Sequence, residues 1–323
     1  MSFGSDTSSF APWAVDHASA DVIFVISATA SKYPTNVAVA GPDCSAIVSQ
    51  NRWDVDTWSF AGQVPLRFSS LMEGVEMFDN NAFSMSQQEV RHMDPQARLL
   101  LQQTAEVFTF SGHLRLKSLE IGVVVGTYQD EYGPTAAKAL SMTSYDVTNM
   151  VTCPQAGRIS YFFGLKGSCC TVDTACSSAL VSANLAVSSL QSTNSPAHVV
   201  ASVNLVMPIM QAACTVANML SADGRSKTLD AAADGYGRAE ACFVHLFESQ
   251  LIGDGTDKAM AIVMASHVNQ DGRSSSLTAP HGPSQERLVV DAMIKARVGP
   301  NDVGYYELHG TGKCCHSHML TTH

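Results

Sequence analysis

The sequence has few charged residues and no apolar run long enough to cross a membrane. Asp, Glu, Lys and Arg make up 15% of its 323 residues, against roughly a quarter in average proteins. Apolar runs such as residues 22–26 and 259–265 are far shorter than the ~20 residues of a membrane span. Hydrophobic residues make up 46%, enough for a large core. We therefore expect a folded protein without a membrane span.

Basic residues are scarce as well. The chain has 19 Lys and Arg against 29 Asp and Glu, a formal net charge of −10. Phosphate surfaces would repel such a chain, so no nucleic acid is expected as a partner, although a local basic patch for an acidic carrier protein is compatible with this total. The first basic residue is Lys32, which argues against a secretory signal and an Arg-rich transit peptide. We expect a cytoplasmic location, with plastids and other organelles left open.

The cysteine pattern lacks pairing signals. The nine cysteines are odd in number and include no Cys-x-x-Cys pair, so neither a disulfide framework nor a zinc site is indicated. A reducing compartment is the simpler interpretation. Four of these cysteines are interpreted as packing residues: Cys169, Cys170, Cys214 and Cys242.

Hydrophobic periodicity alternates between strand and helix along the chain, which favours a layered α/β fold. Asp94 and Pro95 predict the cap and first position of a helix. Strands are expected at residues 21–26, 121–126, 168–172, 198–203, 259–268 and 303–309, with a turn at 269–273. The buried faces of three helices are expected to carry Leu99, Leu100, Gln103, Val107 and Phe110; Ala179, Leu180, Ala183, Ala186, Val187 and Leu190; and, after a cap at Ser284, Leu288, Val289, Ala292, Met293 and Ala296.

Cys176 falls where an expected strand turns into an expected helix. The free amides and dipole of a helix N-terminus favour the thiolate, the form that attacks carbonyl carbon. Taken alone, the residue is better explained as a small apolar packing residue, which is the usual role of a buried cysteine. His309 ends another expected strand, where sites occur in α/β folds, but a lone histidine there is also compatible with a structural role.

Residues 172–180, Val-Asp-Thr-Ala-Cys-Ser-Ser-Ala-Leu, resemble the active-site signature of β-ketoacyl synthases, in particular the type I polyketide synthase branch. Each further match is weak by itself, but together they keep one order along residues 50–312. These matches lie at residues 52–56, 93–101, 157–167, 220–225, 234–238, 269–273, 277–280 and 307–312.

The resemblance implies a thiolase-like, five-layered α/β/α/β/α fold, usually dimeric. It implies that Cys176 takes an acyl group from the phosphopantetheine of an acyl carrier protein and that a decarboxylated malonyl-type unit then attacks it. His309 matches the first of two histidines that assist decarboxylation and stabilise the enolate, and Thr311 matches a residue along the pantetheine arm. No metal and no organic cofactor bound by the chain itself are implied.

The sequence departs from the family after Gly312. The family continues toward a second catalytic histidine, a lysine and a Gly-rich loop. Residues 313–323 of this chain do not follow that family pattern. We therefore expect a truncated ketosynthase of weak or no activity, with a divergent segment 1–50, a nucleophile-bearing half 51–255, a partial second half 256–312 and a non-family tail. Smaller departures from the family pattern, at residues 168–169 and 238–241, affect the expected shape of the substrate pocket.

Several alternatives stay open. Cys314, Cys315, His316 and His318 are ligand types, but their crowding does not fit zinc-site spacing. A non-catalytic partner or dimerisation subunit fits the incomplete second half, whereas the retained Cys176 counts against it. A thiolase or type III synthase would share the fold but not the residues around the cysteine. A papain-like hydrolase fits neither the position of Cys176 nor its flanks.

Overall fold

The computed structural model describes residues 22–34, 43–58, 67–112, 120–128, 131–192, 195–251, 259–275 and 280–312. The tail 313–323, with its cysteines and histidines, lies outside these residues, as does most of segment 1–50. The described strands are β1 (Val22–Lys32), β2 (Ala46–Ile47), β3 (Phe68–Ser69), β4 (Gly122–Thr127), β5 (Cys169–Val172), β6 (Ala197–Asn204), β7 (Ala241–Leu251) and β8 (Ala261–Ile262). The α-helices are α1 (Gln87–His92), α2 (Pro95–Ser111), α3 (Tyr132–Leu140), α4 (Asp146–Asn149), α5 (Pro154–Phe163), α6 (Ser178–Ser192), α7 (Pro208–Val216) and α8 (Gly282–Ala296); short 3-10 turns are η1 (Val55–Trp58), η3 (Ala175–Ser177) and η5 (Pro300–Asp302).

The centre of the molecule is a mixed six-stranded sheet in the order β5-β4-β6-β7-β1-β8. β4 runs parallel to both β5 and β6, whereas β6–β7, β7–β1 and β1–β8 are antiparallel. The carboxyl ends of β4, β5 and β6 therefore meet at one edge of the sheet. Because β7 runs the opposite way, its beginning lies at this same edge, with Ala241 paired to Asn204.

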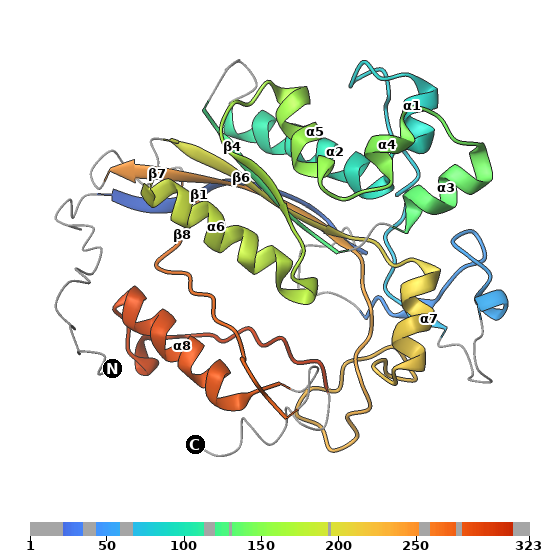
Figure 1. Cartoon of the computed structure of the whole chain (residues 1–323). Helices are drawn as coiled ribbons and strands as arrows, with labels where there is room; N and C mark the ends of the chain where they lie inside the picture. Colours follow the sequence, from blue (N-terminus) through green and yellow to red (C-terminus); the bar gives the residue numbers. More distant parts are fainter. Residues whose placement is uncertain are drawn as a thin grey trace, which may run out of the picture.

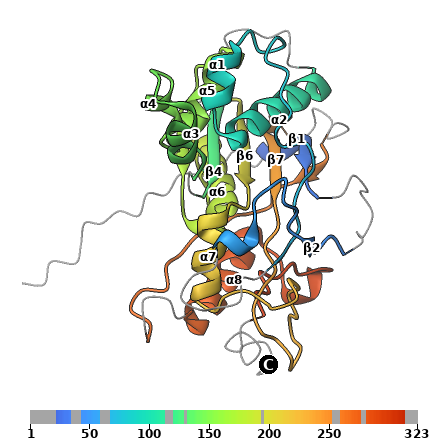
Figure 2. The same cartoon turned by 90° about the vertical axis from the view of Figure 1, so that its right-hand side faces the viewer.

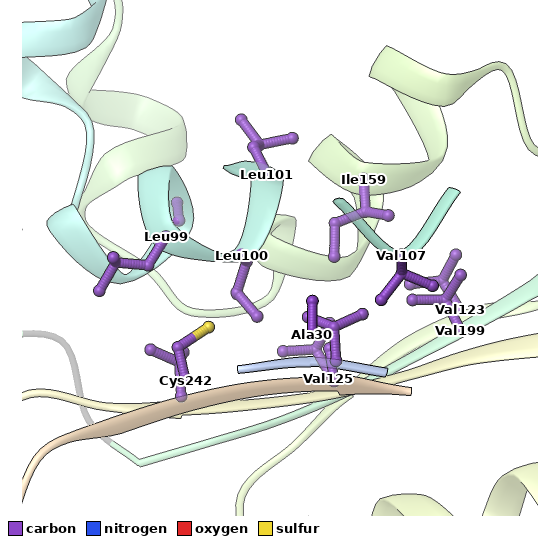
Figure 3. Close-up of a cluster of buried hydrophobic side chains, with 14 of the residues drawn as sticks. Ala30, Leu99, Leu100, Leu101, Val107, Val123, Val125, Ile159, Val199 and Cys242 are labelled. Carbon is purple, nitrogen blue, oxygen red and sulfur yellow. The ribbon is translucent and has the colours of Figure 1, made fainter. Parts of the chain in front are cut away.

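Helices α2 and α5 cover one face of the sheet (Figure 1). Asp94 caps α2 as predicted, its Oδ1 accepting from the amide of Gln96 at 2.8 Å, and Pro95 takes the first helical position. The predicted stripe is buried from Leu99 to Val107. Figure 3 shows Leu99, Leu100 and Val107 of this stripe over the sheet, together with Ile159 of α5. Phe110 is the exception: it is 74% exposed and lies in the last turn of α2, before the left-handed Gly112.

Helix α6 covers the opposite face of the sheet (Figure 1). Its Ala186, Val187 and Leu190 are buried against the sheet, as predicted. Ala179 and Leu180 are exposed, so that part of the prediction was wrong. In the first turns of α6 the buried face runs through Ser178 and Ser182 instead, which leaves Ala179 and Leu180 on the solvent side.

The strands predicted around residues 121–126, 168–172 and 198–203 are confirmed as β4, β5 and β6 within one or two residues. β1 runs on to Lys32, well past the predicted end at Ile26, through a register shift between Ile26 and Ala28. Cys214 and Cys242 are buried, as predicted. Cys169 and Cys170 are exposed instead, because β5 is the edge strand of the described sheet.

The predictions were less accurate after β7. The strand expected at 259–268 is only two residues long, and residues 303–309 form no strand, since they have no hydrogen-bonded neighbouring strand among the described residues. Ser284 lies inside α8, whose N-cap is His281. α8 lies beyond α6, on the side of the sheet away from α2 (Figure 1, Figure 2), and none of its residues is buried. Val289, predicted to be buried, is 49% exposed.

Among the described residues, no helix is both long and apolar enough to cross a bilayer.

Candidate active site

Cys176 lies in the short turn η3, between the end of β5 and the first residue of α6. The carboxylate of Asp173 accepts from the amide of Ala175 at 2.9 Å and starts this turn. Ala175 has φ +56°, the left-handed region that costs an alanine energy. The turn thus presents Cys176 at the helix N-terminus, as the sequence predicted.

The side chain of Ser178 fastens this turn. Its hydroxyl accepts from the amide of Thr174 at 2.8 Å and donates to the carbonyl of Ala175 at 2.7 Å. The backbone of Ser178 also touches β4: a Cβ at Gly126 would lie 2.6 Å from its carbonyl oxygen. Only glycine fits there, so the end of β4 fixes the position of the turn. Ser178 was quoted as part of the signature, but its role was not predicted.

The structure brings His309 to Cys176 from the far end of the described chain. A hydrogen bond to the His309 imidazole lowers the pKa of the Cys176 thiol, helped by its own backbone amide and that of Ser177. The same hydrogen bond raises the pKa of His309. Both shifts favour a thiolate beside an imidazolium, the reactive form of a cysteine nucleophile. Both side chains belong to exposed residues, so a substrate can reach them.

A close-packed turn at residues 310–312 holds His309 in place. The hydroxyl of Thr228 donates to the carbonyl of Gly310. Gly310 and Gly312 have φ +52° and +62°, and a Cβ on Gly312 would lie 2.8 Å from the carbonyl oxygen of Gly235. Thr311 lies between them and is partly buried. It does not line the cavity described below, and its contact with pantetheine stays a prediction.

The segment that carries Thr228 is itself fixed by a small charge network. Lys227 Nζ donates to Asp223 at 3.0 Å and to Asp234 at 2.7 Å. Hydrogen bonds from Ser221 and Lys227 lower the pKa of Asp223 to about 2, so this carboxylate stays ionised at any ordinary pH. The network lies close to the solvent and holds the loop against which the turn after His309 packs.

A cavity of about 520 Å³ opens beside Cys176. It lies at the sheet edge where β4 and β6 end and is closed by the start of α6, by α7 and by the residues that precede β7. Apolar and sulfur-bearing side chains from α7 form one wall, and Tyr128, Tyr236 and Arg238 contribute polar groups. Of these residues, the sequence analysis connected only position 238 with the shape of the pocket. The others were not predicted, because they come from separate segments and carry no shared spacing.

Among the residues that the structure describes, no cluster of three or more His, Cys, Asp or Glu side chains is placed to hold a metal ion.

Comparison with known proteins assigns the family. The sequence matches the β-ketoacyl synthase N-terminal domain over residues 21–251 and the corresponding C-terminal domain over residues 260–315. The chain belongs to the β-ketoacyl synthase family. The predicted family is thereby confirmed, and the relatives described next, which are polyketide synthases, confirm the predicted type I branch.

The relatives of this ketosynthase chain are large synthases. It is 40% identical over 274 residues to polyketide synthase GfsA of Streptomyces halstedii, covering 83% of this chain and 4% of that protein. It is 36% identical over 290 residues to the partially reducing polyketide synthase tpeA of Talaromyces stipitatus, covering 86% and 11%. The chain thus spans only a small part of these curated relatives.

Solved ketosynthases share its fold. The oxazolomycin ketosynthase domain OzmH KS7 of Streptomyces albus matches with a TM-score of 0.82 and 27% identity, covering 93% of this chain and 55% of that one. The ketosynthase from module 6 of the bacillaene synthase of Bacillus subtilis 168 gives 0.80 and 28%, covering 93% and 52%. The predicted thiolase-like α/β fold is confirmed, and this chain spans about half the length of these ketosynthases.

Proposed function

We propose that this ketosynthase chain accepts an acyl group on Cys176 and serves carbon–carbon bond formation in polyketide or fatty-acid synthesis. The observation that carries the proposal is Cys176, which lines the 520 Å³ cavity and whose pKa is lowered by a hydrogen bond with His309. A thiolate supplies the nucleophile, and the cavity offers room for the acyl chain that it would hold.

The first step is a thioester exchange. The Cys176 thiolate attacks the carbonyl carbon of an acyl-pantetheine thioester, a new C–S bond forms, and the old C–S bond breaks. The departing pantetheine sulfur takes up a proton, for which the His309 imidazolium is the donor beside Cys176.

The second step is the condensation. A malonyl-type thioester loses carbon dioxide, and the electron pair left on its α-carbon attacks the acyl carbonyl on Cys176. The Cys176 thiolate leaves and is thus regenerated. A donor at His309 would stabilise the enolate oxygen that precedes the attack.

The partner proposed for both steps is an acyl carrier protein that presents its phosphopantetheine to the site. The chemistry needs no metal and no organic group bound by the chain itself. A homodimer is proposed for the ketosynthase as a whole. Thr311, two residues after His309, is proposed to lie along the pantetheine arm.

Condensation by this 323-residue chain alone is proposed to be weak. In the described part of the chain, the one imidazole hydrogen-bonded to Cys176 is that of His309, whereas the family's decarboxylation employs two histidines. Acyl transfer to Cys176 requires only the first half of the machinery, so the two activities are expected to separate.

Intact-protein mass spectrometry tests the acyl-transfer step. The purified chain is mixed with an acyl-pantetheine thioester, beside a Cys176→Ala variant and a Cys170→Ala variant, which removes another exposed thiol. We expect one acyl group on the native chain and on Cys170→Ala, and none on Cys176→Ala. Absence of acylation in a chain shown to be folded by circular dichroism would refute catalysis and favour a non-catalytic partner subunit.

A further inference from the structure

Two tyrosine hydroxyls in the wall of the cavity donate to sulfur atoms. The Tyr128 hydroxyl lies 3.6 Å from Met210 Sδ, and the Tyr236 hydroxyl lies 3.8 Å from Cys214 Sγ. Thioether and thiol sulfurs are weak acceptors. Both phenols therefore retain most of their capacity to donate to an oxygen atom placed in the cavity.

Arg238 adds a third donor to the same wall. Its Nη1 lies 3.5 Å from the amide oxygen of Gln211, at the limit of a hydrogen bond, and no carboxylate of the described chain forms an ion pair with it. Glu131 is near enough to feel its charge, but the Glu131 carboxylate already accepts the amides of Ile209 and Met210 at 3.0 Å each.

The three donors lie close to one another and to the nucleophile. The charge of Arg238 acts on the pKa of both tyrosines, and Tyr128 is also within electrostatic reach of Cys176. Burial is the largest influence on both phenols and raises the pKa of each. Both hydroxyls therefore keep their protons, and can donate, throughout the neutral range.

We propose that Tyr128, Tyr236 and Arg238 make this cavity selective for acyl chains that carry a keto oxygen over plain alkyl chains. This selectivity rests on the proposed function, since it concerns the acyl group held by Cys176. An alkyl chain would displace water from the cavity. The three donors would then have only weak acceptors, two sulfur atoms and one amide oxygen at 3.5 Å. A keto oxygen would accept from them, and a site built to bond an oxygen discriminates against the analogue that lacks it.

The test compares two diffusible thioesters of equal length, the N-acetylcysteamine esters of hexanoic acid and 5-oxohexanoic acid. The rate of acylation of Cys176 is followed by intact mass at low ester concentration. Each rate is divided by that of the same ester with glutathione, which removes differences in intrinsic reactivity.

We expect the native chain to take the 5-oxohexanoyl group about fivefold faster, the range that one or two net hydrogen bonds provide. The ratio should approach one in the Tyr128→Phe/Tyr236→Phe variant and fall in Arg238→Gln. Tyr161→Phe is the matched control, because Tyr161 is 83% exposed on α5 and does not line the cavity; its ratio should equal that of the native chain.

Two outcomes would overturn the selectivity: equal corrected rates for both esters in the native chain, or a ratio that persists unchanged in the double variant. The first comparison needs no substitution, so it holds even if a variant fails to fold. Acylation of Cys176 by neither ester is a distinct result, which overturns the proposed function and this inference with it.

Discussion

The environment of Cys176 shows how single residues set the reactivity of the site. The left-handed Ala175 and the hydroxyl of Ser178 shape the turn, and His309 supplies the hydrogen bond that lowers the pKa of the thiol. The thiolate fraction at neutral pH thus depends on one imidazole contributed by a distant segment.

Removal of that imidazole is expected to slow the reaction of Cys176 with iodoacetamide at pH 7 several-fold. In the native chain the pKa of Cys176 lies below its ordinary value because of the His309 hydrogen bond, so alkylation saturates at lower pH. In His309→Ala the midpoint of the pH–rate profile should move upward. Alkylation is located by peptide mass mapping, with exposed Cys153 as the internal reference. A midpoint that does not move would show that the imidazole has no influence on the thiol.

The structure brings together Cys176 and His309, the two residues that the sequence proposed as catalytic. Cys176 and His309 were predicted because each lies within a continuous sequence motif that indicates its chemistry without knowledge of the fold. Tyr128 and Arg238 were not predicted as neighbours, because only the folding of β4 and the segment before β7 brings them to one cavity. Residues that come together from distant segments have no characteristic spacing in the sequence by which they could be recognised.

Glu240 connects several elements at the edge of the sheet that carries the site. Its side chain is fully buried and accepts from the amides of Met72 and Val206 at 2.7 and 3.0 Å. It also forms an ion pair with Arg52. One carboxylate therefore ties the start of β7 to the segment after β6 and to two earlier loops.

The Glu240→Ala substitution is expected to lower the free energy of unfolding by about 3–5 kcal/mol, because it leaves the Arg52 guanidinium and two buried amides without their acceptor. Urea denaturation followed by circular dichroism measures the change. Glu73→Ala, at an exposed position, is the matched control and should change stability by less than about 0.5 kcal/mol. Equal midpoints for the two variants would contradict this role of Glu240.

The helices and strands predicted from periodicity were confirmed where neighbouring elements pack against them on both sides. β4 lies between β5 and β6 and was predicted to within one residue, and α2 begins at the predicted Pro95. The strand expected at 303–309 failed, because an extended apolar segment becomes a strand only when another strand pairs with it. Tyr305 and Leu308 of this segment are 77% and 44% exposed.

At the scale of the whole molecule, two histidines lie inside the central sheet. His198 of β6 is fully buried beneath Gly122, where an added Cβ would lie 2.3 Å from its Nε2. His245 of β7 is half-buried, with Nδ1 2.8 Å from the hydroxyl of Thr29. Burial lowers the pKa of both imidazoles, so the folded sheet keeps them neutral.

The free energy of unfolding is therefore expected to fall as the pH is lowered from about 7 through the ordinary histidine pKa near 6.5. Below that value the imidazoles of the unfolded chain bind protons, whereas the buried imidazoles of the folded sheet stay neutral. Acid therefore favours unfolding. Urea titrations between pH 7.5 and 5.5, values spanning about one unit on each side of 6.5, should show a flatter dependence for His198→Gln than for the native chain. A slope for His198→Gln equal to that of the native chain would contradict a neutral buried His198.

The convergence of strand ends at one edge has a consequence for engineering this protein. The last residues of β4 and β6, together with Tyr128 and residues that precede β7, line the cavity, whereas the middle of each strand is buried between α2, α5 and α6. Acyl-group selectivity and the stability of the fold thus depend on different stretches of the chain. A library confined to positions 127, 128, 204, 236 and 238 would diversify the acyl group accepted while leaving the apolar layers of the sheet untouched.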